Sequence, residues 1–184
     1  MIAVLQRTSN ASVSVNNKVI GQIQDGLVVL LGVKKGDSYK ESEYLAQKVS
    51  KLRIFNDKQN KMNLSLIDIS GSVLVISQFT ICADTKKGRR PSFINAESPD
   101  LSKKLYNKFK SYLADKGLKV ESGEFGPTMD VKLVNNGPVK INSIFPWFDA
   151  LNSLQETITV GELIKNALFA RNRDLSISEM QQIH

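Results

Sequence analysis

The chain has 184 residues, 41% hydrophobic and 23% charged, which suits one globular domain and excludes a disordered or fibrous chain. The net charge is +7, and the positive excess lies in residues 1–142, which contain 22 basic and 13 acidic residues. Such a basic body suits a polyanionic partner, although scattered lysines also serve solubility. A single cysteine, Cys82, excludes an internal disulfide and fits a reducing cytosol, and a single histidine, His184, argues against histidine-based triads and His-rich metal sites.

The first third of the chain is rich in strand patterns. Residues 2–7 are typical of a strand and lack the pattern of a signal peptide, and residues 11–15 alternate apolar side chains with serine. The pair Asn16-Asn17 predicts a turn, and residues 19–23 return as the second arm of a hairpin. The longest apolar run, at residues 27–31, is too short for a membrane span, so the segment 27–33 is interpreted as a central strand. We expect no membrane association and a cytoplasmic location.

The rest of the chain adds two helices and further strands. Ser38 and Glu41 form a capping-box pattern before one helix, and Ser98 followed by Pro99 predicts the start of another, which Gly117 ends. Residues 73–83 and the alternating residues 129–133 predict strands. The sequence therefore predicts an α+β fold, a single domain with an antiparallel or mixed barrel-like sheet and two main helices.

Two polar segments are candidates for chemistry. Ser77-Gln78-Phe79-Thr80 is predicted at the end of an apolar strand, with Ser77 and Phe79 on one face; an ordinary strand is the alternative. Asn135-Asn136-Gly137-Pro138 is typical of a plain turn, although a Gly-Pro peptide also permits the cis form and exposes two carbonyl groups. No nucleotide-binding glycine motif and no cysteine-ligand spacing is present, so we expect no cofactor and no metal.

A dense basic cluster lies between these two segments. It consists of four cations within five residues, closed by a proline: Lys86, Lys87, Arg89 and Arg90. The glycine inside it and Pro91 after it predict an exposed loop. Such a loop either grips phosphate groups or is merely solvated.

Several segments, taken in order, resemble the D-aminoacyl-tRNA deacylases of the bacterial and eukaryotic type. The resemblance rests on residues 1–7, 11–13, 26–33, 63–66 and 87–93, and above all on Ser77-Gln78-Phe79-Thr80 and on Asn135-Asn136-Gly137-Pro138-Val139, which are similar to the two signature motifs of that family. It spans residues 1–142. It implies hydrolysis of the ester bond of D-aminoacyl-tRNA, that is, chiral proofreading in translation. Whether the enzyme also hydrolyses glycyl-tRNA mischarged on tRNA-Ala is left open.

The resemblance also implies roles for individual residues. It implies a homodimer in which Gly137 and Pro138, joined by a cis peptide, enter the substrate pocket of the partner, with Asn135 beside them and Arg7 orienting this loop. Ser77, Gln78, Phe79 and Thr80 would line the ester, with the N–H groups of Phe79 and Thr80 facing the oxyanion; Thr80 is either a nucleophile or a pocket wall. Met129 would border the adenosine or the pocket wall. The basic cluster would bind phosphates of the tRNA.

Two features depart from the family pattern and leave an alternative open. Lys140 stands where the family motif has threonine. In an extended segment it would face the same side as Pro138. The deacylase domain is predicted at residues 1–142, and residues 143–184 have no counterpart in the compact members of the family. A capping-box pattern at Thr159 and Glu162 predicts that this second part is a helical extension, and its role is unknown. A non-catalytic tRNA-binding or nucleic-acid-binding homologue is the alternative function.

Overall fold

The computed structural model describes residues 1–86 and 88–144, so the extension predicted for 143–184 lies, from residue 145 on, outside the described residues. The elements, in chain order, are β1 (Ile2–Val15), β2 (Lys18–Ile23), β3 (Gly26–Gly32), α1 (Tyr39–Lys51), β4 (Phe55–Asn56), β5 (Met62–Leu64), β6 (Ser72–Ser77), the 3₁₀-helix η1 (Phe79–Cys82), α2 (Pro99–Ala114), β7 (Lys119–Ser122) and β8 (Asp130–Ile144).

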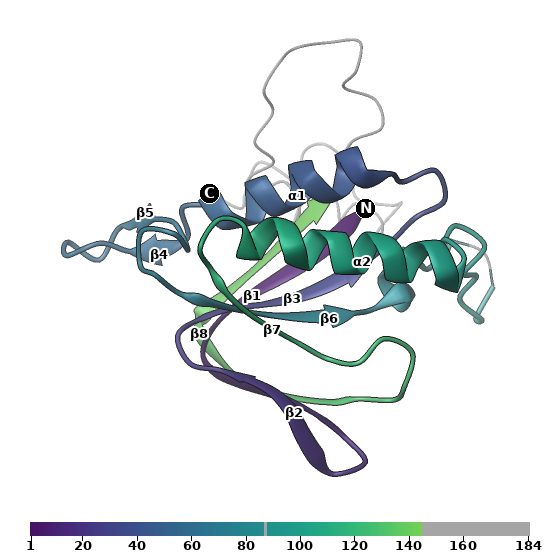
Figure 1. The fold of residues 1–184 in the computed structure, drawn as a ribbon, viewed down its shortest axis with the longest axis horizontal. Helices are drawn as coiled ribbons and strands as arrows, with labels where there is room; N and C mark the ends of the chain where they lie inside the picture. The colour runs from purple at the N-terminus through teal and green to yellow at the C-terminus, as the bar shows by residue number, and fades with distance from the viewer. Residues whose placement is uncertain (87, 145–184) are drawn as a thin grey trace, which may run out of the picture. The chain divides into compact units, whose positions relative to one another are not determined.

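A mixed sheet carries the fold (Figure 1). Its strand order is β2-β1-β3-β6-β7, with β8 paired to β1; β6 is parallel to β3 and to β7, and β1 is antiparallel to β2, β3 and β8. The sheet curls until its two ends, β2 and β7, nearly meet. A Cβ placed on Gly21 of β2 would lie only 3.0 Å from the carbonyl oxygen of Ser122 in β7. The predicted α+β fold with a barrel-like sheet and two helices is confirmed.

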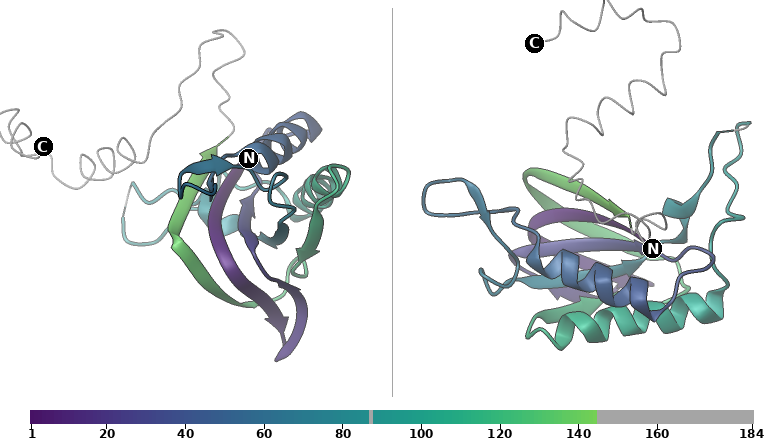
Figure 2. Two further views of the ribbon diagram at one scale, coloured as in Figure 1. Left: turned by 90° about the vertical axis from the view of Figure 1, so that its left-hand side faces the viewer. Right: turned by 90° about the horizontal axis from the view of Figure 1, so that it is seen from above.

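Apolar side chains fill two layers, one on each face of the sheet. Alternation along β3 sends Leu27, Val29 and Leu31 toward α1 and α2, whereas Val28 faces the hollow of the curled sheet. Both helices cover the same face of the sheet (Figure 2). The second layer, inside the curl, contains Ala11, Val13, Ile23, Val28, Leu74 and Ile76.

The local signals in the sequence explain most element boundaries. The side chain of Ser38 and the carboxylate of Glu41 form the expected capping box at the start of α1. Asn16 and Asn17 both have positive φ, 49° and 63°, as the hairpin turn between β1 and β2 requires. Ser98 is the N-cap of α2, but its side chain makes no capping hydrogen bond.

Three sequence predictions about strands were wrong in detail. Residues 2–15 form one continuous strand rather than two, because bulges between Gln6 and Asn10 absorb the change of register against β8. Strand β6 ends at Ser77, and a 3₁₀ turn replaces the strand predicted to continue to residue 83. Residues 135–138 do not end a strand, since β8 runs through them to Ile144.

Candidate active site

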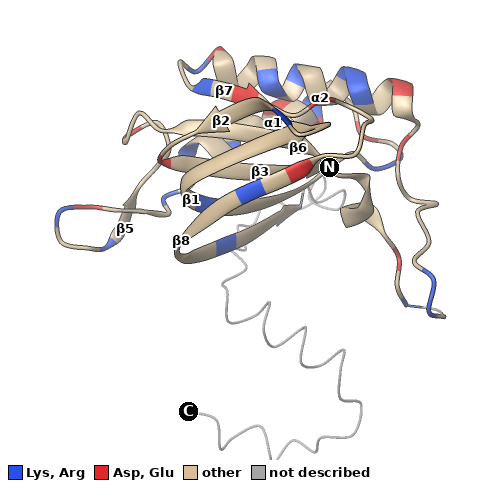
Figure 3. Ribbon diagram, turned by 90° about the horizontal axis from the view of Figure 1, so that it is seen from below, with Lys and Arg blue, Asp and Glu red and all other residues tan. Residues whose placement is uncertain are grey.

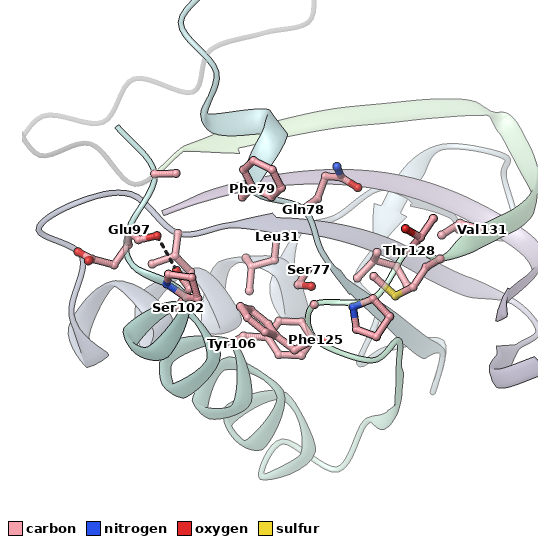
Figure 4. A pocket seen from close by; sticks show the side chains of 17 residues that line it. Leu31, Ser77, Gln78, Phe79, Glu97, Ser102, Tyr106, Phe125, Thr128 and Val131 are labelled. Atoms are coloured by element: carbon pink, nitrogen blue, oxygen red, sulfur yellow. Dashed lines mark hydrogen bonds between the residues drawn. The ribbon is translucent and has the colours of Figure 1, made fainter. Parts of the chain in front are cut away.

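A cavity of about 590 Å³ opens where β6 ends, between the N-terminal part of α2 and the segment 125–131 (Figure 4). Leu31 of β3 and Ile76 of β6 supply apolar wall, and Ser77, Gln78 and Phe79 line it at the end of β6. The cavity lies where a strand stops and the chain changes direction. Backbone groups are free of the sheet at such a point, which is typical of a binding site.

Ser77, Gln78, Phe79 and Thr80 lie on a strand-to-turn junction instead of on two faces of a strand. The N–H of Gln78 still donates to the carbonyl oxygen of Leu31 in β3 at 2.8 Å, but the next residues turn into η1. The side-chain amide of Gln78 donates to the hydroxyl oxygen of Thr80 at 2.5 Å. Phe79 and Thr80 are exposed, whereas Ser77 and Gln78 are half-buried.

The backbone N–H groups of Phe79 and Thr80 have no acceptor within the described residues. They are the first two N–H groups of η1, and the first donors of a helix have no partner inside it. Gln78 precedes them with φ −146° and ψ 82° and makes no capping hydrogen bond to them. Phe79 lines the cavity, and Thr80, which does not line it, is the next residue. Two adjacent free donors of this kind can stabilise a developing oxyanion.

Tyr106 and Phe125 form the apolar floor of the cavity. Their ring centroids are 5.8 Å apart, and Figure 4 shows them next to each other below Ser77. The hydroxyl of Tyr106 donates to the carbonyl oxygen of Val75 at 2.8 Å, and burial raises its pKa to about 12. This tyrosine is therefore neutral and held in place, so it provides shape rather than acid-base chemistry.

Met129 also lines this cavity, together with several residues that the sequence did not single out. The residues missed are Glu97, Ser102, Tyr106, Phe125 and Thr128. The N–H of Ser98, donated to the Glu97 carboxylate at 2.7 Å, lowers the pKa of that carboxyl, so it stays ionised. None of these residues forms a motif in the sequence, because the site is assembled from α2, the residues just before it and the 125–131 segment.

Gly137 and Pro138 do not line this cavity. They lie in the bulged part of β8, between the pairs Thr8–Asn135 and Gln6–Lys140, and Pro138 and Lys140 are both exposed. No peptide bond among the described residues is cis. The bond between Gly137 and Pro138 is therefore trans, and the prediction of a cis bond there was wrong. The physical reason is that β8 stays extended through this point and its bulge absorbs the change of register, whereas cis proline belongs to tight turns.

Arg7 supports the Gly137–Pro138 segment from behind. The residue is only 7% exposed. Nε donates to the carbonyl oxygen of Asn136 at 3.0 Å, and Nη1 donates to that of Ile54 at 2.7 Å and to the side-chain oxygen of Asn56 at 3.2 Å. A Cβ on Gly137, whose φ is +120°, would lie 2.5 Å from Nη2 of Arg7, so only glycine fits there. Arg7 and Asn136 line a separate hollow of about 320 Å³, while the side-chain amide of Asn135 donates to Gln6 at 3.4 Å.

The basic cluster forms a loop that backbone pairing holds at its base. Asp84 and Ser92 pair through N–H to carbonyl bonds of 2.8 and 2.9 Å, and Figure 3 shows basic residues near the tip. Lys86, Arg89 and Arg90 are exposed, and none has an ion-pair partner within residues 1–86 and 88–144; Lys87 lies outside the described residues. These cations are free to contact an external anion.

The described part of the chain has neither a candidate membrane span nor a candidate metal site. Over residues 1–86 and 88–144, no helix has the length and apolarity that a membrane crossing needs. In the same ranges, acidic, cysteine and histidine side chains do not gather in groups of three or more that would hold a metal ion.

Comparison with known proteins gives a consistent result for the body of the chain. The family model described as D-Tyr-tRNA(Tyr) deacylase matches residues 4–143. The D-aminoacyl-tRNA deacylase of Thermotoga petrophila is 54% identical over 141 residues, which is 77% of this chain and 95% of that protein. The D-aminoacyl-tRNA deacylase of Desulfatibacillum aliphaticivorans is 53% identical over 141 residues, 77% of this chain and 97% of that protein.

Solved structures agree with the fold. A c-Myc DNA unwinding element binding protein aligns with a TM-score of 0.75 at 36% identity, covering 79% of this chain and 99% of that one. A probable eukaryotic D-amino acid tRNA deacylase aligns with a TM-score of 0.66 at 17% identity, covering 77% and 98%, and shows likeness of fold alone.

Proposed function

The chain belongs to the D-Tyr-tRNA(Tyr) deacylase family, and from this premise we infer that the cavity at the end of β6 is its active site. The protein is an enzyme that hydrolyses the ester bond of D-aminoacyl-tRNA and releases the free tRNA and the D-amino acid. The observation that carries the assignment of the site is the pair of free N–H groups of Phe79, which lines this cavity, and of Thr80, the next residue.

An aminoacyl ester is already activated, so the site needs little acid-base chemistry. Water attacks the carbonyl carbon, the negative charge that develops on the carbonyl oxygen is stabilised by the two N–H groups, and the ribose hydroxyl of the tRNA leaves with a proton. Thr80 is not the nucleophile in this proposal. Its hydroxyl accepts the amide of Gln78, and no base among the described residues is hydrogen-bonded to it. The terminal hydroxyl of the tRNA assists the proton transfer.

The apolar floor formed by Tyr106 and Phe125 receives the terminal adenosine, with Met129 at its border. Flat apolar rings and few polar groups suit a nucleobase. A deacylation time course with D-Tyr-tRNA against L-Tyr-tRNA tests the function directly. Loss of the D-ester with the L-ester essentially untouched is expected; equal release from both esters, or release from neither, would contradict it.

We propose that the working unit is a homodimer in which each subunit places Gly137 and Pro138, with a trans peptide, at the cavity of its partner. The support is geometric: this segment is exposed and held by Arg7, yet it lies outside the cavity of its own subunit. The family resemblance of the Asn135-Asn136-Gly137-Pro138 motif agrees with this arrangement.

Sedimentation at micromolar concentration should therefore show a dimer, since a specific contact of this kind buries more than about 1,000 Å². Full activity in a preparation that sediments only as monomer would contradict the dimer. The experiment needs no variant, and a dilution series measured for both mass and activity reports the two quantities on the same sample.

The exposed basic loop is proposed to bind phosphates of the tRNA. Changing Lys86, Lys87, Arg89 and Arg90 to alanine should weaken tRNA binding and flatten its dependence on salt by a few units of slope, since about one counterion is released per neutralised phosphate. Hydrolysis of a D-aminoacyl-adenosine ester should fall far less. Equal damage to both substrates would mean that the loop shapes the pocket.

The deacylase domain is proposed to end at the end of β8. The sequence placed its boundary at residue 142, but Ser143 is buried and pairs with Ala3, and Ile144 pairs with Ile2. Truncation after Ile144 should leave a folded, active domain, because the matched 141 residues make up 95–97% of the relatives' own length. A truncated protein that is inactive or lacks a cooperative melting transition would show that the extension is integral. A cytoplasmic location is likewise a proposal.

A further inference from the structure

Two aromatic rings are exposed together at the mouth of the cavity. Phe79 is 58% exposed and Phe93 is 38% exposed, and their centroids lie 5.1 Å apart in an edge-to-face arrangement. Their interplanar angle is 68°. We call Phe79 and Phe93 the aromatic pair. A single exposed phenylalanine needs no explanation, but two in contact beside a functional cavity indicate a contact surface.

The backbone around Phe93 is held on both sides, so the ring is positioned before any ligand binds. On one side Ser92 pairs with Asp84. On the other side the N–H of Lys35 donates to the carbonyl oxygen of Asn95 at 3.0 Å, and the N–H of Glu97 donates to that of Val33 at 3.1 Å. A surface held in this way loses little conformational entropy on binding.

The aromatic pair lies between the cavity and the basic loop. Phe79 lines the cavity, and Phe93 follows directly on the loop that carries Lys86, Arg89 and Arg90. Exposed aromatic rings next to free cations are the combination that binds single-stranded nucleic acid, since bases stack on the rings and phosphates contact the cations.

We propose that the aromatic pair is a stacking platform for the unpaired nucleotides that precede the terminal adenosine of the substrate. The proposal rests on the function given above and adds a second contact at the mouth of the catalytic cavity. Stacking tolerates any base, because every base has a π-face, and therefore suits an enzyme that acts on many tRNAs.

Charge favours this occupant over a second copy of the chain. A two-fold contact centred on the aromatic pair would place this patch against the same patch of the second copy and bring Lys86, Arg89 and Arg90 of both copies together. Like charges brought together in this way repel. A polyanionic strand instead matches the cations and the rings at the same time.

The test compares three D-tyrosyl esters, of adenosine, of the trinucleotide CCA and of full-length tRNA. In the wild type the trinucleotide ester should have the higher kcat/KM of the two small substrates. In Phe93→Ala this advantage should fall about tenfold, within the range measured for loss of one stacked base. Phe93→Trp should keep the advantage, and Phe93→Leu, which is apolar without a π-face, should lose it.

Ile94→Ala is the matched control, because Ile94 is 69% exposed and adjacent in the chain but outside the aromatic pair. An equal loss in Ile94→Ala, or an equal loss for the adenosine and trinucleotide esters in Phe93→Ala, would overturn the platform. A shift of Phe93→Ala from dimer to monomer in sedimentation would also overturn it and assign the surface to a protein interface.

Binding of unacylated CCA-ended oligonucleotide, measured by fluorescence anisotropy, separates this proposal from the function on which it rests. If the wild type hydrolyses none of the three esters, the function fails, but about tenfold weaker binding by Phe93→Ala and not by Phe93→Trp still supports the platform. Unchanged binding in Phe93→Ala would overturn it whatever the enzyme hydrolyses.

Discussion

Phe79→Pro should lower kcat for D-Tyr-tRNA hydrolysis about 10²–10³-fold below the value for Phe79→Ala, the loss expected when one oxyanion donor is removed. Both variants lack the ring, so their difference isolates the N–H of residue 79. Proline has no N–H, and residue 79 is the first residue of η1, where the fixed φ of proline is compatible with a helical turn. Single-turnover deacylation measures the chemical step directly.

Three outcomes decide the assignment. Equal rates for Phe79→Pro and Phe79→Ala, with equal melting temperatures, would show that this N–H does not stabilise the oxyanion. Thr80→Val keeps the backbone donor but lacks the hydroxyl, so complete loss of activity in that variant would identify the hydroxyl as the nucleophile. Partial activity in Thr80→Val together with the large effect of Phe79→Pro would support the backbone as the main catalyst.

Local sequence signals predicted the fold well, because they act over a few residues. The capping box of Ser38 and Glu41 and the Asn16-Asn17 turn depend on neighbours in the chain, and both lie where expected. Continuity of strands was harder to predict. Whether residues 8–10 break a strand or bulge within it is decided by pairing with β8, more than 120 residues away.

The site was only partly predictable, for the same reason. Ser77 and Gln78 could be singled out as polar residues after an apolar strand, but the turn that frees the N–H groups of Phe79 and Thr80 has no strong sequence signal. Tyr106 is indistinguishable in sequence from the buried residues of an amphipathic helix, since its neighbours Leu105 and Phe109 belong to the core. The cis peptide was inferred from a motif, while the extended course of β8 keeps the bond trans.

Arg7→Met should destabilise the fold by about 2 kcal/mol or more, because removal of the guanidinium takes the donor from two backbone carbonyl oxygens and from the side-chain oxygen of Asn56. The two backbone oxygens are those of Asn136 and Ile54. Methionine retains most of the apolar volume, so the loss reports the hydrogen bonds rather than a cavity. Urea unfolding measures it. At a temperature where the variant is fully folded, kcat/KM should still fall, because the Gly137–Pro138 segment loses its support.

Mixing two impaired variants then tests whether this segment acts across the dimer. Arg7→Met subunits have an intact cavity and a released Gly137–Pro138 segment, whereas Phe79→Pro subunits have the reverse. If the segment serves the partner, each mixed dimer contains one site with an intact cavity and an intact segment, so mixing after reversible dissociation restores activity that neither variant has alone. If the segment serves its own cavity, every site in the mixture keeps one defect and mixing restores nothing. Phe79 and Arg7 line separate hollows of a subunit. Recovery on mixing therefore requires that the proposed dimer brings the intact cavity of one subunit to the intact Gly137–Pro138 segment of the other.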